Sequence, residues 1–292
     1  MSQSPVVART IESVRSAIAA AAQARRDENP SARSAIGFVP TMGYLHDGHA
    51  TLIRRAREEC DVVVVSIFVN PTQFGPSEDF TTYPRDVDRD LALLAREHAD
   101  VAFVPEVKEL YPHGAMATLE PASVASPLEG ARRPGHFKGV VTVVHKLFEA
   151  VRPHRAYFGE KDWQQLQVVR ALVREYKMPI AVIGVPTIRE PDDLAMSSRN
   201  VRLSAEERVS ARCVPRALNA ARAAFAGGET RPPALERAMR DVIAAEPAAT
   251  LDYAVVVDAA SLRSIQTATT DSRALIALRV GSVRLIDNMP LG

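Results

Sequence analysis

The feature that most constrains the fold is an unbroken β-branched run, Asp61-Val62-Val63-Val64-Val65-Ser66-Ile67-Phe68-Val69. A run without polar alternation is typical of a strand buried on both faces of a parallel sheet. Shorter apolar runs predict further strands at 34–39, 101–105, 156–158 and 180–185. Residues with helical spacing surround these strands at 11–22, 48–59, 86–98, 140–151 and 162–176. This alternation predicts an α/β fold with a Rossmann-like, doubly wound parallel sheet.

The composition of the chain changes near residue 188. The polar segment Arg189-Glu190-Pro191-Asp192-Asp193 predicts a hinge. Beyond it we expect helices near 204–226 and 233–246, and strands at 251–257, 274–278 and 283–286. The chain is therefore expected to form two domains, a Rossmann-like N-terminal domain over 1–188 and a smaller C-terminal α+β domain over 189–292.

Charge and composition exclude several classes of protein. The 292 residues contain 36 Lys and Arg against 35 Asp and Glu, a net charge of +1, so no basic excess points to nucleic acid. Two distant cysteines, Cys60 and Cys213, form neither a disulfide framework nor a metal cluster. We expect no membrane span and no signal peptide, and hence a cytoplasmic protein.

Polar residues follow four of the predicted strands. In open α/β sheets, ligands bind outside the carboxyl ends of the strands. The four polar sets are Pro40–His49, Asn70–Gly75, Gly159–Asp162 and Pro186–Asn200. Because Pro40 lacks a backbone N–H, we expect the 34–39 strand to end there. The sequence predicts a ligand site where these four sets meet.

The segment His46-Asp47-Gly48-His49 opens a predicted helix. A helix N-terminus attracts phosphate, and imidazoles placed there can donate hydrogen bonds to phosphate oxygens. Gly43 and Gly48 let the backbone approach a nucleotide closely. The alternatives are two ordinary surface histidines or a metal site, although no further metal ligands are evident.

The other polar sets also have two interpretations. Lys161 is either a point charge that binds phosphate or carboxylate, or a solvated residue beside a helix cap at Asp162. In the first turn of the helix that follows, Gln164 or Gln165 should face the cleft. Met196-Ser197-Ser198-Arg199 is either a ligand segment or a polar linker. Asn70 and Gln73 either recognise substrate oxygens or form a turn. A basic loop bears Arg132, Arg133, His136 and Lys138, and either touches an anion or is solvated.

The ordered motifs together resemble a known family. They are PTMGYLHDGH, VNPTQFGPSEDFTTYPR, RPGHFKGV, GEKDWQQL and PTIREPDDLAMSSRN. The chain resembles the HxGH-type nucleotidyltransferases, and more narrowly the pantoate–β-alanine ligase family. No GxxxxGK[ST], GxSxG or HExxH motif, and no GxGxxG motif after a strand, points elsewhere.

The resemblance implies a reaction in two steps. ATP and (R)-pantoate give pantoyl adenylate and pyrophosphate, and the amine of β-alanine then displaces AMP to give pantothenate. It implies His49, His46 and Lys161 as catalytic residues and Gln73, Gln165 and Asn70 as residues of the pantoate and β-alanine site. The implied ATP-binding residues are Met42, Gly43, Tyr44, Leu45, His46, Asp47, Gly48, His49, Gly159, Glu160, Lys161, Asp162, Ile188, Met196, Ser197, Ser198 and Arg199.

The resemblance also implies Mg²⁺ bound with ATP, without dedicated protein ligands. It implies a homodimer, for which the apolar 61–69 region is a candidate interface. We expect the smaller domain to close over ATP, and the long polar segment 70–85 to be a gate that excludes water from the adenylate.

Three alternatives remain open. Another HxGH-type adenylyltransferase would take a phosphate rather than a carboxylate as acceptor. An aminoacyl-tRNA synthetase would need a tRNA-binding region, which 292 residues and a charge of +1 do not favour. A nucleotide-sensing module that kept the fold would bind ATP without turnover.

Overall fold

The computed structural model describes residues 4–29, 34–76, 78 and 80–292. The chain forms two compact units. One contains Met1–Glu160 and Val168–Pro186, and the other contains Lys161–Gln167 and Thr187–Gly292. The long second part of the chain therefore starts at Thr187, and a short segment from the middle of the sequence joins it. Within the described ranges, no helix is both long and apolar enough to cross a membrane.

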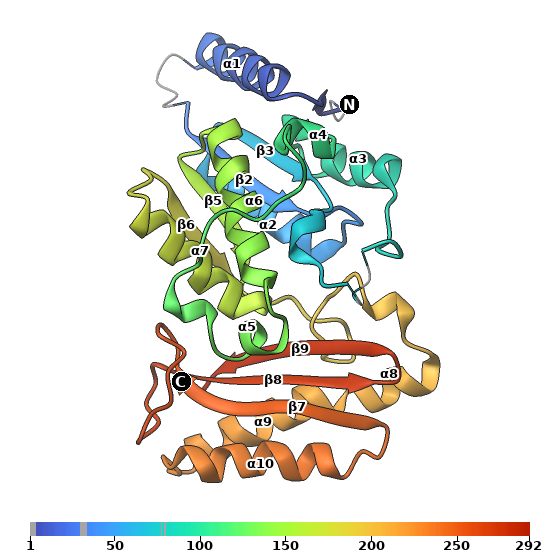
Figure 1. Ribbon diagram of the computed structural model, residues 1–292, viewed down its shortest axis with the longest axis vertical. Helices are drawn as coiled ribbons and strands as arrows, with labels where there is room; N and C mark the ends of the chain where they lie inside the picture. Colours follow the sequence, from blue (N-terminus) through green and yellow to red (C-terminus); the bar gives the residue numbers. More distant parts are fainter. Residues whose placement is uncertain (1–3, 30–33, 77, 79) are drawn as a thin grey trace. The chain divides into compact units, whose positions relative to one another are not determined.

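A six-stranded parallel sheet forms the centre of the first unit (Figure 1). The parallel sheet and five of its strands were predicted, and β1 was not. Its strands are β1 (Val6–Ala8), β2 (Ile36–Thr41), β3 (Val62–Ile67), β4 (Val101–Phe103), β5 (Arg155–Gly159) and β6 (Ala181–Val185). Their order is β1-β4-β3-β2-β5-β6. Because the order reverses at β2, the crevice between the ends of β2 and β5 is the position where such folds bind ligands.

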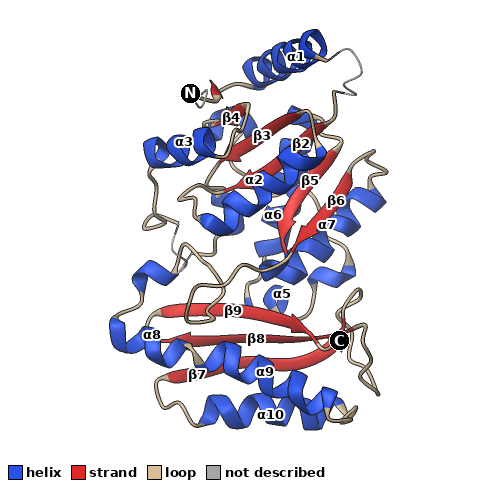
Figure 2. Ribbon diagram, turned by 180° about the vertical axis from the view of Figure 1, so that it is seen from behind, coloured by secondary structure: helices blue, strands red, loops and turns tan. Residues whose placement is uncertain are grey.

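Helices cover both faces of this sheet (Figure 2). The helices of the first unit include α1 (Ile11–Glu28), α2 (Asp47–Glu59), α3 (Val87–Arg96), α4 (Val107–Leu110), α5 (Glu129–Arg132) and α6 (His136–Val151), and α7 (Trp163–Glu175) begins in the second unit. Helices α1 and α6 pack on one face, and α2 and α3 on the other, where Ile53 and Leu94 meet Val63 and Val65. All six residues of β3 are buried between its neighbours in the sheet, so these residues offer no exposed surface for the expected dimer interface.

Two expected boundaries were wrong. Strand β2 continues through Pro40 to Thr41. The backbone polar groups of Thr41 point towards β3, so those of Pro40 point towards β5. The pairing of β5 with β2 stops at Phe38, so the N–H that Pro40 lacks would have no partner in the sheet. Helix α6 begins at His136, not Val140, and includes part of the expected basic loop. Gly139 lies inside this helix because the backbone of Thr72 passes where a Cβ would sit.

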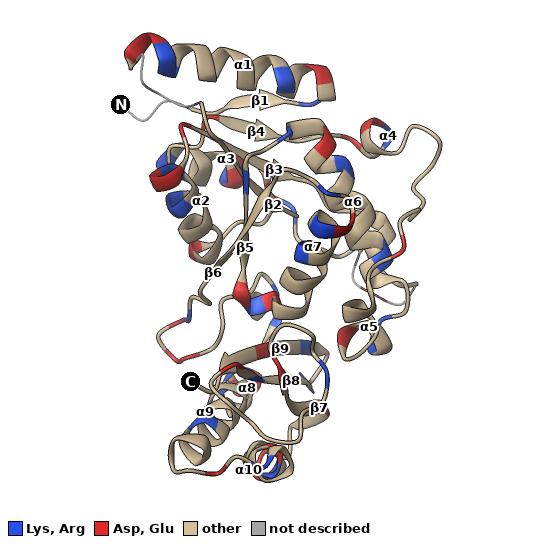
Figure 3. Ribbon diagram, turned by 90° about the vertical axis from the view of Figure 1, so that its left-hand side faces the viewer, with Lys and Arg blue, Asp and Glu red and all other residues tan. Residues whose placement is uncertain are grey.

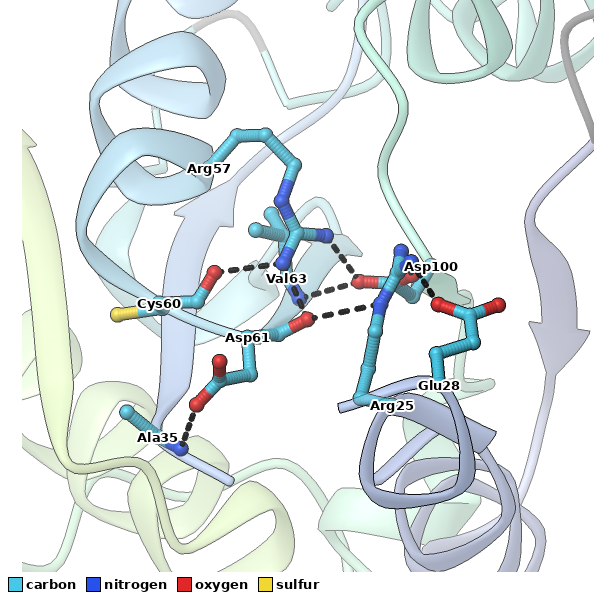
Figure 4. A network of polar contacts seen from close by, with 8 residues as sticks. All are labelled: Arg25, Glu28, Ala35, Arg57, Cys60, Asp61, Val63 and Asp100. Carbon is cyan, nitrogen blue, oxygen red and sulfur yellow. Dashed lines mark hydrogen bonds and ion pairs between the residues drawn. The ribbon is translucent and has the colours of Figure 1, made fainter. Parts of the chain in front are cut away.

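Charged residues connect the amino ends of the strands to two helices (Figure 4). Asp100 accepts hydrogen bonds from Arg57 of α2 (2.6 Å), from Arg25 of α1 (3.0 Å) and from the backbone N–H of Val63 (2.7 Å). Asp61 accepts the N–H of Ala35 at 2.8 Å. This cluster lies at the end of the sheet opposite the predicted ligand crevice.

The second unit is an α+β structure, as predicted. Strands β7 (Ala249–Asp258), β8 (Ser272–Val280) and β9 (Val283–Pro290) form an antiparallel sheet in that order. Helices α9 (Cys213–Ala226) and α10 (Pro232–Ala244) pack on it through Leu218, Leu235 and Met239, and α8 (Ala205–Ala211) precedes them. Acidic and basic residues are interspersed along α1, α2 and α10, in keeping with the balanced net charge (Figure 3).

Candidate functional site

The turn after β2 has an unusual backbone. Gly43 and Tyr44 have φ values of +81° and +52°, two successive residues in the left-handed region. A side chain other than glycine in this region costs roughly 1 kcal/mol or more, so the surroundings must hold Tyr44 there. The Thr41 hydroxyl donates to the Ser66 carbonyl (2.6 Å) and accepts the N–H of Gly43 (3.1 Å). Residues expected to line the ATP site thus occupy a fixed turn at the carboxyl end of β2.

Asp90 of α3 holds the same turn and was not predicted. Its two carboxylate oxygens accept the backbone N–H groups of Tyr44 (2.8 Å) and Leu45 (2.6 Å), and its side chain is buried. Burial raises the pKa of the Asp90 carboxyl, and the two N–H groups oppose that shift. One signal was available in the sequence. Asp90 lies four residues before the buried Leu94, so a carboxylate occupies the apolar face of a helix.

The two histidines of the HxGH segment lie together at the start of α2. Helix α2 begins at Asp47, and His46 occupies its N-cap position. The imidazole centroids are 4.1 Å apart, and the N–H of His46 donates to Nδ1 of His49 at 3.3 Å. A neutral imidazole that accepts at Nδ1 carries its proton at Nε2. His49 can therefore donate a hydrogen bond through Nε2, beside the positive end of the helix dipole.

Gln73 and Met42 come from the ends of neighbouring strands, and the structure brings them together. The Gln73 amide Nε2 lies 3.1 Å from the Met42 sulfur, and its Oε1 accepts from Asn70 at 3.1 Å. Asn70 is buried, donating also to the Gly139 carbonyl (3.2 Å) and accepting from the Tyr111 hydroxyl (2.8 Å). These contacts show Asn70 orienting Gln73 from inside the unit; a direct role for Asn70 in substrate binding stays a prediction.

One interpretation placed Arg133 and His136 in a solvated basic loop, and the structure contradicts it. Arg133 forms two 2.7 Å hydrogen bonds to the carboxylate of Glu78, and His136 Nδ1 lies 2.9 Å from the Gln73 carbonyl. Burial lowers the pKa of His136 to about 4, so its neutral ring donates from Nδ1 and accepts from Arg133 at Nε2 (3.0 Å). This row of contacts links α6 to segment 70–85, of which Ser77 and Asp79 lie outside the described residues.

The carboxyl end of β5 supplies Gly159 and Glu160, beside β2 in the sheet. A Cβ added to Gly159 would meet no atom within 4 Å, so its backbone is open to a ligand. The predicted residues of the first unit that follow β2, β3 and β5 are thus gathered at one edge of the sheet.

Lys161, Asp162 and Gln165 belong to the second unit. The Lys161 ammonium lies 3.9 Å from the Asp162 carboxylate, and the Lys161 carbonyl accepts from Asn288 of β9 at 2.8 Å. Gln165 is half-buried in the first turn of α7. Asn288 was not predicted, because nothing in the sequence marks a distant strand as the support of this turn.

The segment that carries Ile188 and Met196 forms a closed turn. The N–H of Met196 donates to the Ile188 carbonyl (2.9 Å), and Arg189 pairs with Ala195 in an antiparallel bridge. The expected hinge at 189–193 stays a prediction. Within this segment Arg189 pairs with Asp287 at 2.7 Å, and Arg208 pairs with Glu190 and with Asp192. Burial raises the pKa of the Asp287 carboxyl, and Arg189 opposes that shift.

The segment continues into Ser197, Ser198 and Arg199. The Arg199 N–H donates to the Ser197 hydroxyl at 3.3 Å. Ser198 is buried, and Ser197 and Arg199 are half-buried.

As to metals, the described part of the chain has no group of three His, Cys, Asp or Glu side chains placed to hold an ion.

Comparisons with known proteins agree with this geometry. The family model described as "Pantoate-beta-alanine ligase" matches residues 6–290. The pantothenate synthetase of Deinococcus radiodurans is 56% identical over 268 residues, covering 89% of this chain and 95% of that protein. The pantothenate synthetase of Roseiflexus sp. (strain RS-1) is 54% identical over 255 residues, covering 87% and 92%.

Solved structures are similar over nearly the whole chain. A crystal structure of pantothenate synthetase from Thermus thermophilus has a TM-score of 0.90 and 44% identity, covering 98% of this chain and 99% of that one. A pantoate-beta-alanine ligase from Francisella tularensis, crystallised with beta-gamma ATP and beta-alanine, has a TM-score of 0.76 and 34% identity, covering 98% of each chain.

Proposed function

Because the chain belongs to the pantoate-beta-alanine ligase family, we propose that it joins (R)-pantoate to β-alanine through pantoyl adenylate, with ATP converted to AMP and pyrophosphate. The observation that carries the proposal is the His46–His49 pair at the N-terminus of α2, at the crevice beside β2 and β5. This position supplies N–H donors and a positive helix dipole where a triphosphate needs them.

In the first step a pantoate carboxylate oxygen attacks the α-phosphorus of ATP, and pyrophosphate leaves. Both reactants are anions, so catalysis is mainly positioning and charge stabilisation. His49 donates from Nε2 to the phosphate oxygens, and His46 binds beside it. The Met42–Leu45 turn and Gly159–Glu160 present backbone to the nucleotide. Mg²⁺ enters with ATP as part of the substrate, which suits a chain that supplies few metal ligands.

In the second step the β-alanine amine attacks the acyl carbon of the adenylate, AMP leaves, and the amine loses a proton. Gln73 binds pantoate and lies near β-alanine, with Gln165 as a further ligand of pantoate. The gate at 70–85 keeps water from the adenylate, and the Arg133–Glu78 pair and the packing of Phe74 on Phe80 and Tyr83 support this role. Weakening the gate should raise adenylate hydrolysis relative to pantothenate formation.

In the second unit, Lys161 bridges phosphate and pantoate, and Asp162, Ile188 and Met196–Arg199 bind ATP. We keep closure of this unit over ATP as part of the proposal, to be tested by small-angle scattering with and without a non-hydrolysable ATP analogue. A homodimer and a cytoplasmic location are also proposed on family grounds. Light scattering of the purified chain tests the dimer.

One assay tests the function. The wild-type chain should release pyrophosphate from ATP when pantoate is present, and release AMP when β-alanine is added as well. Release of pyrophosphate with a phosphorylated acceptor instead of pantoate would favour another HxGH-type adenylyltransferase. Tight binding of ATP with no turnover under either condition would favour a nucleotide-sensing module.

A further inference from the structure

Strand β9 carries two consecutive polar residues, Asp287 and Asn288, that are both buried, each with 3% of its surface exposed. Neighbouring residues of a strand point to opposite faces, so one side chain of such a pair is usually solvated. Burying both is costly unless each finds hydrogen-bond partners. Each residue has a partner in one of the two segments that carry the proposed ATP ligands of the second unit.

Asn288 holds the turn before α7. Its Nδ2 donates to the Lys161 carbonyl at 2.8 Å, and its Oδ1 accepts from Nε of Arg273. The Arg273 guanidinium lies over the Trp163 ring, 3.5 Å from its centroid, and the indole N–H donates to the Ala259 carbonyl at 2.7 Å. The backbone of Lys161 is therefore fixed to the antiparallel sheet on one side by Asn288 and on the other by Trp163.

Asp287 holds the turn at 188–196. Its two oxygens accept from the guanidinium of Arg189 at 2.7 and 3.2 Å, and Arg189 also donates to the Asp193 carbonyl at 2.9 Å. A charge-assisted pair with two hydrogen bonds fixes orientation as well as distance. Ile188, which directly precedes Arg189, and Met196, bonded to Ile188, are held with it.

We propose that Asp287 and Asn288 are positioning residues of the ligase, which set the places of the Lys161 turn and of the 188–199 segment. The inference rests on the proposed function, since the roles of Lys161 and of Met196–Arg199 come from there. Neither Asp287 nor Asn288 need touch a substrate. Misplacing a catalytic group by about 1 Å can lower a rate by roughly 100-fold, so the support of these segments should be visible in kinetics.

The decisive variant is Asn288→Asp. An aspartate keeps the shape and an oxygen for Arg273, but it has no N–H for the Lys161 carbonyl. We expect kcat for ATP–pyrophosphate exchange with pantoate to fall at least about tenfold, with less change in the KM for ATP. Trp163, the single tryptophan of the chain, should keep its emission maximum, because the Arg273 contact is retained. Asn288→Ala should lose activity and shift the emission as well.

Asp287→Asn tests the second contact. It keeps the volume but leaves Arg189 without a carboxylate, so the 188–199 segment should be less well held and the KM for ATP should rise several-fold. The matched control is Asp252→Asn, which removes the 2.9 Å pair with Arg284 in the same sheet, away from both segments. This control should change the unfolding midpoint only.

The outcomes separate the two proposals. If the wild type shows no pantoate-dependent exchange, the proposed function is wrong and the positioning role in the ligase falls with it. If the wild type is active and Asn288→Asp has near-normal kcat, the positioning role is wrong. The role is also wrong if Asn288→Asp and Asp287→Asn, like Asp252→Asn, change the unfolding midpoint without a change in kcat or KM.

Discussion

At the scale of single residues, the arrangement at the start of α2 makes His49 the strongest candidate for a hydrogen-bond donor to the phosphates. Its Nδ1 accepts the N–H of His46, which leaves Nε2 to donate. We expect His49→Ala to lower ATP–pyrophosphate exchange by more than about 100-fold, the scale of losing a donor to developing charge. Isotope exchange with pantoate measures this. A rate near that of the wild type would remove His49 from the mechanism.

Asp90 offers a second test at this scale. Asp90→Asn replaces one acceptor oxygen by an NH₂ group, which faces a backbone N–H of Tyr44 or Leu45 and repels it. Since a buried donor would lose its partner, we expect a stability loss of about 2 kcal/mol and a KM for ATP raised about tenfold. Asp88→Asn, an exposed carboxylate on the same helix, is the control. Equal KM values for the two variants would show that Asp90 does not position the turn.

At the same scale, the sequence led to the residues at the strand ends more easily than to the residues that support them. His46, His49 and Gln73 follow strands, and their side chains are of types that commonly bind ligands. Asp90 and Asn288 contact turns far away in sequence, and only the folded chain brings these partners together. The roles of Arg133 and His136 were unreadable for the same reason, because both depend on Glu78 and Gln73.

At the scale of elements, the junction of α6 with segment 70–85 should be sensitive to acid. Burial lowers the pKa of His136 from 6.5 to about 4. Between these two pH values, His136 is protonated in the unfolded chain and neutral in the folded chain. Stability is therefore lost as the pH falls from about 6.5 towards 4. Linkage gives a loss of about 2 kcal/mol at pH ~5. Urea unfolding at pH ~7 and at pH ~5, followed by circular dichroism, measures this loss of stability.

The matched variant for that experiment is His136→Asn, whose amide replaces the Nδ1–H donor but does not titrate in this range. Between pH ~7 and ~5, the free energy of unfolding of the variant should therefore fall less than that of the wild type. The difference between the two losses should be about 2 kcal/mol. His113→Asn, at an exposed site, should follow the wild type. Parallel pH curves for wild type and His136→Asn would mean that burial of His136 is not linked to folding.

Elements were predictable where local pattern decides them. The β-branched run of β3 and the helical spacing of α2 are local signals, and both elements were found within one or two residues of the expected limits. Strand β1 has three residues, too few for a pattern, and it exists because β4 pairs with it. Helix α6 starts before the expected Val140 and includes Gly139, which is required by close packing on Thr72. That packing cannot be seen in the sequence, which shows only a glycine.

At the scale of the whole molecule, stability and chemistry are placed at opposite ends of the parallel sheet. The Arg25–Arg57–Asp100 cluster joins the amino ends of the strands (Figure 4), and the proposed ligand residues of the first unit follow the carboxyl ends. A strand of six residues such as β3 separates them by about 20 Å. The assignment of 161–167 to the second unit was not predictable, since it depends on contacts with β9 and not on composition.

This separation predicts that Asp100→Ala is a pure stability variant. The change leaves Arg25, Arg57 and the Val63 N–H without their shared acceptor, so we expect the free energy of unfolding to fall by about 3 kcal/mol. The kcat and the KM for ATP of the folded enzyme should stay within twofold of the wild type, measured well below the unfolding temperature. Glu28→Ala, which removes an exposed partner of Arg25, should cost less than about 0.5 kcal/mol. A change in the KM for ATP in Asp100→Ala, with Glu28→Ala unaffected, would show instead that the two ends of the sheet are coupled.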